Sequence, residues 1–105
     1  MPYSLVFTPE AQEQLLALYR YIAKAASPEI AARYTDAIIS YCESLQEFPM
    51  RGTRRDDIRL GLRITHYKKR SVIAFSVEPE KISIIGIYYG GQDYETVLQI
   101  ELDDL

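Results

Sequence analysis

The chain has 105 residues, which at the usual ~100 to 200 residues per domain predicts a single domain spanning residues 1–105. Hydrophobic residues make up 48% and charged residues 26% of the sequence, a composition typical of folded proteins and unlike that of disordered chains. No apolar run reaches the ~18 residues of a membrane span and no N-terminal signal region is present, so we expect a cytoplasmic protein without membrane attachment. A single cysteine, Cys42, excludes an internal disulfide and, with only one histidine, argues against a metal site.

Charge is distributed unevenly along the sequence. The net charge is −3, which by itself argues against binding to nucleic acid. Residues 51–70 nevertheless contain eight basic and two acidic residues, so this segment carries a charge of +6 and the remainder of the chain −9. Such a segment attracts phosphates or an acidic partner peptide. The alternative is a solvated turn whose charges pair locally, Arg54 and Arg55 with the two aspartates that follow them.

The first half predicts a strand followed by two helices. Residues 3–7 alternate as a short strand does. Thr8, with proline and glutamate behind it, is a helix start, and apolar residues at helical spacing predict a helix over 9–26. Ser27, followed by proline and glutamate, is a second helix start of the same kind, and the helix is predicted to continue until Pro49. The apolar stripe on one face of this helix is Ile30, Tyr34, Ile38, Tyr41, Leu45 and Phe48. Because almost no linker separates them, the helices must form an antiparallel hairpin.

The second half changes to the period of strands. After a polar loop over 50–59, the segments 60–67, 71–77 and 82–89 read as three strands joined by short polar turns, which form an antiparallel meander. The predicted fold is therefore α+β, in the order β-α-α-β-β-β, with the helical hairpin packed on one face of the sheet and the apolar strands in its middle. The acidic tail, about 94–105, is predicted to dock or fray.

Strand parity assigns side chains to sheet faces. Arg63 shares a face with Tyr67, opposite Leu62, and is expected to point away from the helices. On the last strand the alternation places Ile85, Ile87 and Tyr89 on one face, and Ile84, Gly86 and Tyr88 on the other. If Tyr89 is the outward tyrosine, it would stand near Arg63 on the open face of the sheet.

The two glycines, the single cysteine and the tyrosine pair are each expected to have a structural role. Gly90 and Gly91 are expected to serve a turn that needs positive φ, because no Gly-x-Gly-x-x-Gly spacing or P-loop lysine accompanies them. Cys42 lies inside the second helix and is expected to be a small buried hydrophobe. Tyr88 and Tyr89 are interpreted as strand-end aromatics, one in the core and one at the rim. No cofactor is predicted.

The ordered set of segments resembles the RelE/ParE superfamily of bacterial type II toxins. The segments that carry the resemblance are "LQEFPMRGTRR", "LGLRITHYKKRSVIAFSVEPEKISIIGIYYGGQD" and the Gly-x-x-Asp ending from Gly90 to Asp93. The match runs from Tyr3 to about Asp93 and is closer to the ParE branch, with its long helical hairpin and the "FP" pair before the loop.

The ParE resemblance implies a toxin that inhibits DNA gyrase by protein binding, without chemistry of its own, and so arrests growth and stabilises plasmids. It also implies neutralisation by a cognate antitoxin, ParD-like or another small DNA-binding protein with an acidic tail, in a hetero-oligomer. The helical hairpin, the cationic loop and an exposed sheet edge offer a surface for such a partner. The residues expected to bind antitoxin or target are Arg51, Arg54, Arg55, Arg59, Arg63 and Arg70.

The RelE branch implies the alternative of a metal-independent endoribonuclease that cleaves messenger RNA on the ribosome. Arg59 and Arg63 would then hold the phosphate and Tyr89 would act as acid or base. Family members often carry histidine where Tyr89 stands and arginine where Gln92 stands, so this constellation is thin and gyrase inhibition is favoured. Direct nucleic-acid binding stays open. A third hypothesis is a degenerate toxin that retains only antitoxin binding.

Overall fold

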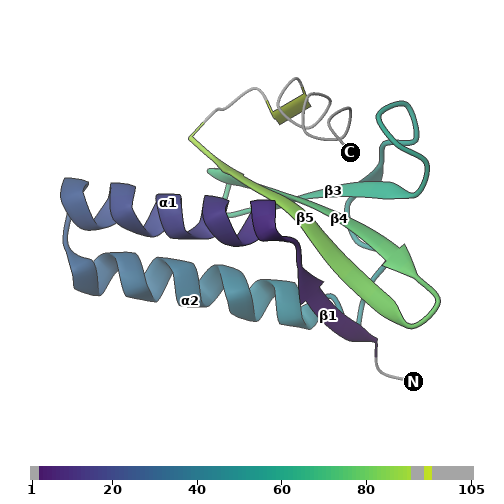
Figure 1. Ribbon diagram of the computed structural model, residues 1–105, viewed down its shortest axis with the longest axis horizontal. Coiled ribbons are helices and arrows are strands. Elements are labelled where there is room, and N and C mark those ends of the chain that lie inside the picture. The colour runs from purple at the N-terminus through teal and green to yellow at the C-terminus, as the bar shows by residue number, and fades with distance from the viewer. Residues whose placement is uncertain (1–2, 91–93, 96–105) are drawn as a thin grey trace.

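The computed structural model describes residues 3–90 and 94–95, which fold as a helical layer against a twisted sheet (Figure 1). The predicted α+β class and the order of strand, two helices and three strands are confirmed. One further strand lies in the loop over 50–59 that was expected to be irregular. The elements are β1 (Ser4–Phe7), α1 (Pro9–Ala25), α2 (Pro28–Ser44), β2 (Thr53–Arg54), β3 (Leu62–Tyr67), β4 (Ser71–Glu78) and β5 (Lys81–Tyr89).

Both helices begin as their sequences predict. The Thr8 side chain accepts a hydrogen bond from the Ala11 N–H at 3.2 Å, and Ser27 accepts one from the Ile30 N–H at 3.1 Å. Each cap satisfies one of the N–H groups that a helix start leaves without an intrahelical partner. Among the described residues no helix has the length and apolar character that crossing a bilayer requires.

The second helix ends earlier than predicted, at Ser44 instead of near Pro49. Beyond it the N–H groups of Leu45 and Gln46 bond to carbonyls three residues back, so the chain continues as tight turns. A residue before proline is disfavoured in the α conformation, which explains why the helix unwinds before Phe48. The prediction that Phe48 lies on the buried stripe is wrong, since its side chain is 60% exposed.

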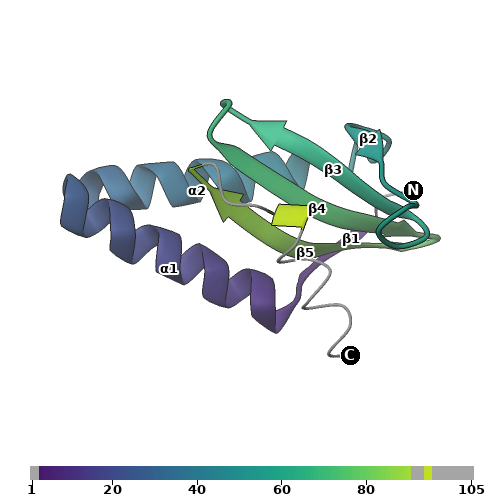
Figure 2. The ribbon, with the colours of Figure 1, turned by 90° about the horizontal axis from the view of Figure 1, so that it is seen from above.

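The sheet has five strands in the order β1-β5-β4-β3-β2 (Figure 2). The predicted antiparallel meander of β3, β4 and β5 is confirmed, with β4 in the middle. β1 pairs in parallel with β5, so the sheet is mixed and not purely antiparallel. β3 begins at Leu62, and Leu60, which was expected to face inward, is 82% exposed.

A β-bulge in β5 changes which side chains share a face. Ala74 pairs with Gly86 but Phe75 pairs with Ile84, so Ile85 is an extra residue in β5. The Thr8 hydroxyl donates to the Ile85 carbonyl at 3.3 Å, which joins the bulge to the start of α1. The predicted strict alternation along this strand is therefore wrong.

The helix-facing side of the sheet carries the larger core. Ile82 and Ile84 before the bulge, and Ile87 and Tyr89 after it, pack with buried residues of both helices. Cys42 is fully buried in this core, as predicted. Burial raises the pKa of its thiol to about 12.

A second, smaller core lies on the other face of the sheet. Leu62, Ile64, Ala74 and Tyr88 are buried there, so neither face of the sheet is simply open. Since Leu62 and Ile64 face away from the helices, Arg63 on the opposite parity faces toward them. The prediction that Arg63 points away from the helices is therefore wrong.

Candidate functional site: a row of tyrosines and cations

Five tyrosines from four elements meet between the helices and the sheet. Tyr21 of α1 contacts Tyr89 of β5 with ring centroids 6.1 Å apart, and Tyr89 contacts Tyr34 of α2 at 5.7 Å. Tyr34 contacts Tyr67 of β3 at 6.2 Å, and Tyr67 contacts Tyr41 of α2 at 5.2 Å. The tilted and edge-on geometries are those that aromatic pairs prefer. We call Tyr21, Tyr34, Tyr41, Tyr67 and Tyr89 the tyrosine row.

Hydrogen bonds fix two rings of the row to the sheet. The hydroxyl of Tyr34 bonds to the fully buried Ser71 hydroxyl at 2.7 Å, and that of Tyr41 to the Thr65 hydroxyl at 2.9 Å. Burial raises the pKa of Tyr34, and the bond to Ser71 offsets part of that rise. These two hydrogen bonds therefore anchor α2 to β3 and β4.

Three cations lie over rings of the row. The guanidinium of Arg70 stands 5.6 Å from the Tyr89 centroid, and that of Arg51 stands 5.4 Å from the Tyr41 centroid. The ammonium of Lys68 stands 5.7 Å from the Tyr67 centroid. Cation–π contacts of this kind contribute about 0.5–1 kcal/mol at exposed sites. Among the described residues no carboxylate lies within ion-pair distance of these three cations.

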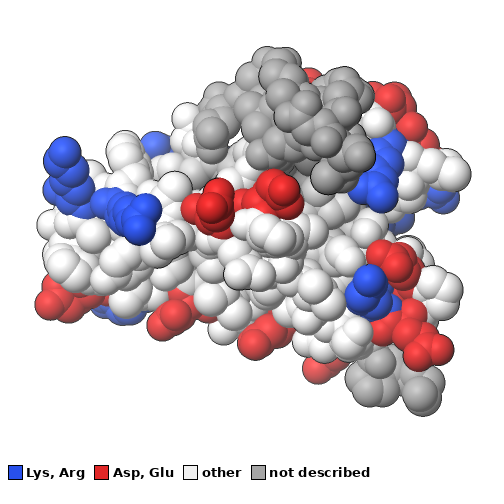
Figure 3. Space-filling model, viewed as in Figure 1, with Lys and Arg blue, Asp and Glu red and all other residues white. Residues whose placement is uncertain are grey.

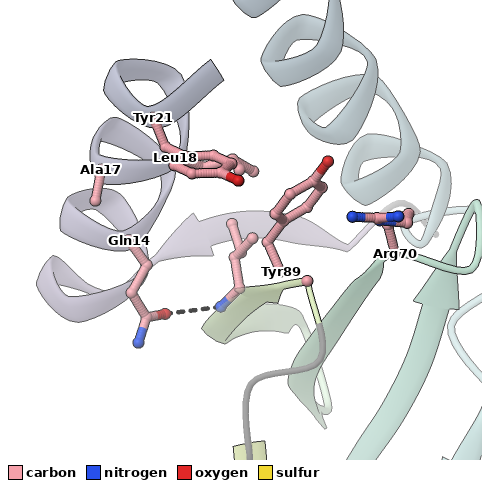
Figure 4. Close-up of a pocket in the computed structure, with 8 residues that line it drawn as sticks. Gln14, Ala17, Leu18, Tyr21, Arg70 and Tyr89 are labelled. Carbon is pink, nitrogen blue, oxygen red and sulfur yellow. Dashed lines mark hydrogen bonds between the residues drawn. The ribbon is translucent and has the colours of Figure 1, made fainter. Parts of the chain in front are cut away.

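A pocket of about 350 Å³ lies at the α1 end of the row (Figure 4). Tyr21 and Tyr89 form its aromatic walls, Arg70 stands at one side, and Gln14 holds the adjacent strand by accepting a hydrogen bond from the Ile87 N–H at 2.7 Å. The described residues that line it include no acidic side chain: Gln14, Ala17, Leu18, Tyr21, Arg70, Ile87, Tyr89 and Gly90. Concave, mostly apolar surfaces with few polar groups are typical of binding sites.

The loop from β3 to β4 holds two lysines under backbone strain, and one of them, Lys68, is among these three cations. Lys68 and Lys69 have φ of 54° and 67°, in the left-handed region that non-glycine residues rarely adopt. Arg70 completes the loop, and its carbonyl accepts from the Gly90 N–H at 2.9 Å. Gly90 itself has φ of 71°, which confirms the predicted glycine turn after β5, whereas Gly91 lies outside the described residues.

Two of the arginines predicted to bind a partner are paired within the chain. Arg54 forms an ion pair with Asp56 at 2.9 Å, and Arg55 pairs with Asp57 at 2.8 Å and Glu95 at 2.6 Å. The hydrogen bond from Arg55 is the main cause of the lowered pKa of Asp57. The local pairing foreseen as the alternative interpretation of these charges is confirmed.

The remaining predicted arginines differ in what holds them. Arg63 donates to the backbone carbonyls of Arg51 and Met50, both at 2.9 Å, so it ties β3 to the segment after α2. Arg51 donates to the Ser44 hydroxyl at 3.0 Å and also contacts Phe48. Arg59 is exposed in the loop before β3.

The three residues named for nuclease chemistry do not meet. Arg63 is paired with position 75 of β4 and Tyr89 with position 71. Positions 71 and 75 are separated along β4 by roughly 13 Å, at ~3.3 Å per residue. β3 and β5 lie on opposite sides of β4, each ~4.8 Å away, so the backbones of Arg63 and Tyr89 are farther apart than that. Arg63 is also occupied by carbonyl groups, and Arg59 lies in the loop before β3. The geometry does not assemble a phosphate clamp around Tyr89.

The two edges of the sheet differ in how they could accept a strand. Along β1 the Gln12 amide donates to the Phe7 carbonyl at 2.9 Å and the Gln46 amide donates to the Tyr3 carbonyl at 2.6 Å, so side chains occupy that edge. At the other edge β2 pairs with β3 only through positions 63 and 64. Positions 65–67, which lie next to the row, extend beyond β2.

Along α1, charge differs between the two ends of the helix (Figure 3). On the face shown, acidic side chains lie over the part of the molecule where α1 begins, and cations gather at the end where α1 finishes. This agrees with Glu10 in its first turn and Lys24 in its last, an arrangement that complements the helix dipole. Within the described residues, no group of three or more His, Cys, Asp or Glu side chains is placed to hold a metal ion.

Sequence reasoning found Arg51, Arg70 and Tyr89 but not the row that joins them. Tyr34 and Tyr41 were predicted to lie on the apolar stripe of the second helix, and both are partly buried against the larger core. Their spacing of seven residues does place both on one helix face. Nothing in the sequence pairs them with a tyrosine of β3 and another of β5, because that contact depends on strand order and on the bulge.

Comparisons with known proteins agree with this fold. A family model described as the ParE toxin of the type II toxin–antitoxin system parDE matches residues 5–94. A solved structure titled as a chromosomal ParDE system from P. aeruginosa resembles the chain with a TM-score of 0.72 and 25% sequence identity. The similarity covers 83% of this chain and 95% of the other. A search of curated protein sequences found no match.

Proposed function

Because this chain belongs to the ParE toxin family of type II toxin–antitoxin systems, we propose that it inhibits DNA gyrase by binding it and that a cognate antitoxin neutralises it. The observation that carries the choice of binding over catalysis is the separation of the nuclease candidates. Arg63 is engaged with backbone carbonyls far from Tyr89, so the residues named for nuclease chemistry are not placed to act on one phosphate together. A binding mechanism requires only a complementary surface.

The surface for partners on this proposal lies on the helix-facing side of the sheet and the loops beside it. Four of the predicted binding residues make no ion pair with a described acidic residue: Arg51, Arg59, Arg63 and Arg70. Because Arg63 is occupied by backbone carbonyls, the first group available to a partner is Arg51, Arg59 and Arg70. Arg54 and Arg55 would first have to exchange their own aspartates for a partner's carboxylates. We propose a hetero-oligomer of toxin and antitoxin in the cytoplasm, formed through the first group.

A supercoiling assay with purified gyrase tests the proposal directly. We expect the purified chain to inhibit supercoiling of relaxed plasmid, and the antitoxin encoded beside it to restore the activity. Induced expression should arrest growth with a DNA damage response. Full supercoiling at a large excess of folded toxin would contradict gyrase inhibition.

The same expression strain separates the alternatives. Cleaved messages on ribosomes, lost in a Tyr89→Phe variant, would establish the nuclease instead. Antitoxin binding without growth arrest would identify a degenerate toxin. Each outcome is distinguishable, because supercoiling, message integrity and complex formation are measured independently.

A further inference from the structure

We propose that the tyrosine row is the docking surface for an extended acidic peptide segment of a protein partner. An aromatic side chain of that segment would occupy the pocket beside Tyr21, and its carboxylates would pair with Arg70 and Lys68. This deepens the proposed function and rests on it, since the antitoxin would be the partner that supplies the segment.

Charge complementarity is the first argument. Three rings of the row each have a cation over them, from Arg70, Lys68 and Arg51. Among the described residues, no carboxylate lies within ion-pair distance of these cations. Arg54 and Arg55, in contrast, are already paired with aspartates. The row therefore presents cations whose charge the described part of the chain does not neutralise, and each can donate a charge-assisted hydrogen bond to a carboxylate.

The pocket supplies an anchor beside these charges. One aromatic side chain suits this pocket, because apolar Leu18 and Ile87 and two tyrosines line it. The pocket volume of about 350 Å³ is sufficient for such a side chain. Buried aromatic anchors surrounded by weaker contacts carry most of the energy in peptide recognition. A peptide with carboxylates flanking an aromatic residue matches both features.

Nucleic acid fits the row less well. Tyr89, Tyr67 and Tyr41 already have cations over their rings, and the hydroxyls of Tyr34 and Tyr41 are bonded to the sheet. Base stacking needs ring faces that are available. The net charge of −3 also disfavours a long polyanion, whose attraction depends on neutralising many phosphates. A short acidic segment meets only the local cations.

Fluorescence polarisation of the full chain tests the proposal with three labelled probes: a poly(Glu,Tyr) copolymer, poly-Glu and single-stranded oligo(dT). We expect the copolymer to bind tightest. Arg70→Gln and Lys68→Gln should each weaken copolymer binding about tenfold, since each removes a charge-assisted contact. The matched control is Lys81→Gln, which loses the same charge at the start of β5, the end opposite Tyr89, and should leave binding within about twofold of the original.

The anchor has its own pair of variants at the exposed Ala17. Ala17→Phe fills the pocket and should reduce the affinity for the copolymer to the level of the affinity for poly-Glu. Ala17→Ser should leave both affinities unchanged. Circular dichroism confirms that each variant is folded. Equal losses for Lys81→Gln and Arg70→Gln, or tighter binding of oligo(dT) than of the copolymer, would overturn the proposal.

Supercoiling inhibition is measured on the same samples, so the two proposals fail separately. Copolymer binding with no gyrase inhibition would overturn the gyrase proposal and leave the peptide surface standing. Gyrase inhibition that the antitoxin relieves equally well in wild type, Arg70→Gln and Ala17→Phe would leave the gyrase proposal standing and remove the row as the docking surface.

Discussion

At the scale of single residues, Gly86 shows how one missing side chain shapes the second core. A Cβ at this position would lie 2.3 Å from the Tyr88 hydroxyl and 2.6 Å from its ring. Tyr88 is 1% exposed, so the ring has no room to move away. The glycine is therefore required for close approach and not for an unusual φ.

Gly86→Ala should destabilise the chain by about 1–3 kcal/mol, the usual cost of overpacking a filled core. Urea denaturation at equilibrium measures the loss. The double variant Gly86→Ala with Tyr88→Leu should lose less free energy of unfolding than the sum of the losses in the two single variants. The shorter leucine side chain leaves room for the added Cβ. Additive losses in the double variant would show that the two residues do not compete for space.

At the scale of elements, the β3–β4 hairpin keeps two lysines where glycine or asparagine would fit better. A left-handed conformation costs roughly 1–2 kcal/mol for a residue with a Cβ. Strain of this kind persists where the surrounding structure enforces it and often marks functional loops. Here it orients a loop whose Lys68 and Arg70 lie over rings of the tyrosine row.

Lys69→Gly should therefore raise the free energy of unfolding by about 1 kcal/mol, since glycine adopts a φ of 67° without strain. Thermal and urea denaturation check this. Lys69→Ala removes the same charge but keeps the Cβ, so it should bring no such gain. Equal stability of the two variants would attribute the effect to charge and not to the backbone.

At the scale of the whole molecule, folding withdraws Cys42 from water into the core between the helical layer and the sheet. Burial raises the pKa of its thiol from 9.0 to about 12. The unfolded chain therefore loses the thiol proton at a lower pH than the folded chain. Stability from this difference is fully present below pH 9 and is lost as the pH rises toward 12.

Cys42→Ala should consequently show a shallower loss of stability between pH 9 and 11 than the wild type, although it is less stable at neutral pH because of the cavity. Urea midpoints across this pH range measure the difference. All other titratable groups are the same in the two proteins, so the comparison cancels their contribution to first order. Parallel pH profiles would show that the thiol does not ionise more readily in the unfolded chain.

The sequence by itself determined the order of the strand, the two helices and the three-stranded meander, and it indicated the family; it missed β2 and the end of α2. Thr8 and Ser27 fixed both helix starts because capping acts over three residues, and alternation located the meander because it depends only on neighbours along a strand. The adjacent charges of Arg54 and Asp56 likewise allowed their pairing to be foreseen. The tail beyond Glu95, predicted to dock or fray, lies outside the described residues.

Only the tertiary structure decided the faces of the sheet and the composition of the site. The extra residue Ile85 reverses the alternation of β5 and so places Tyr89 beneath the helices, and Arg63 faces the helices because Leu62 belongs to a second core. The tyrosine row follows from these two choices together with the strand order. Register and bulges depend on contacts between segments distant in sequence, which local periodicity does not contain.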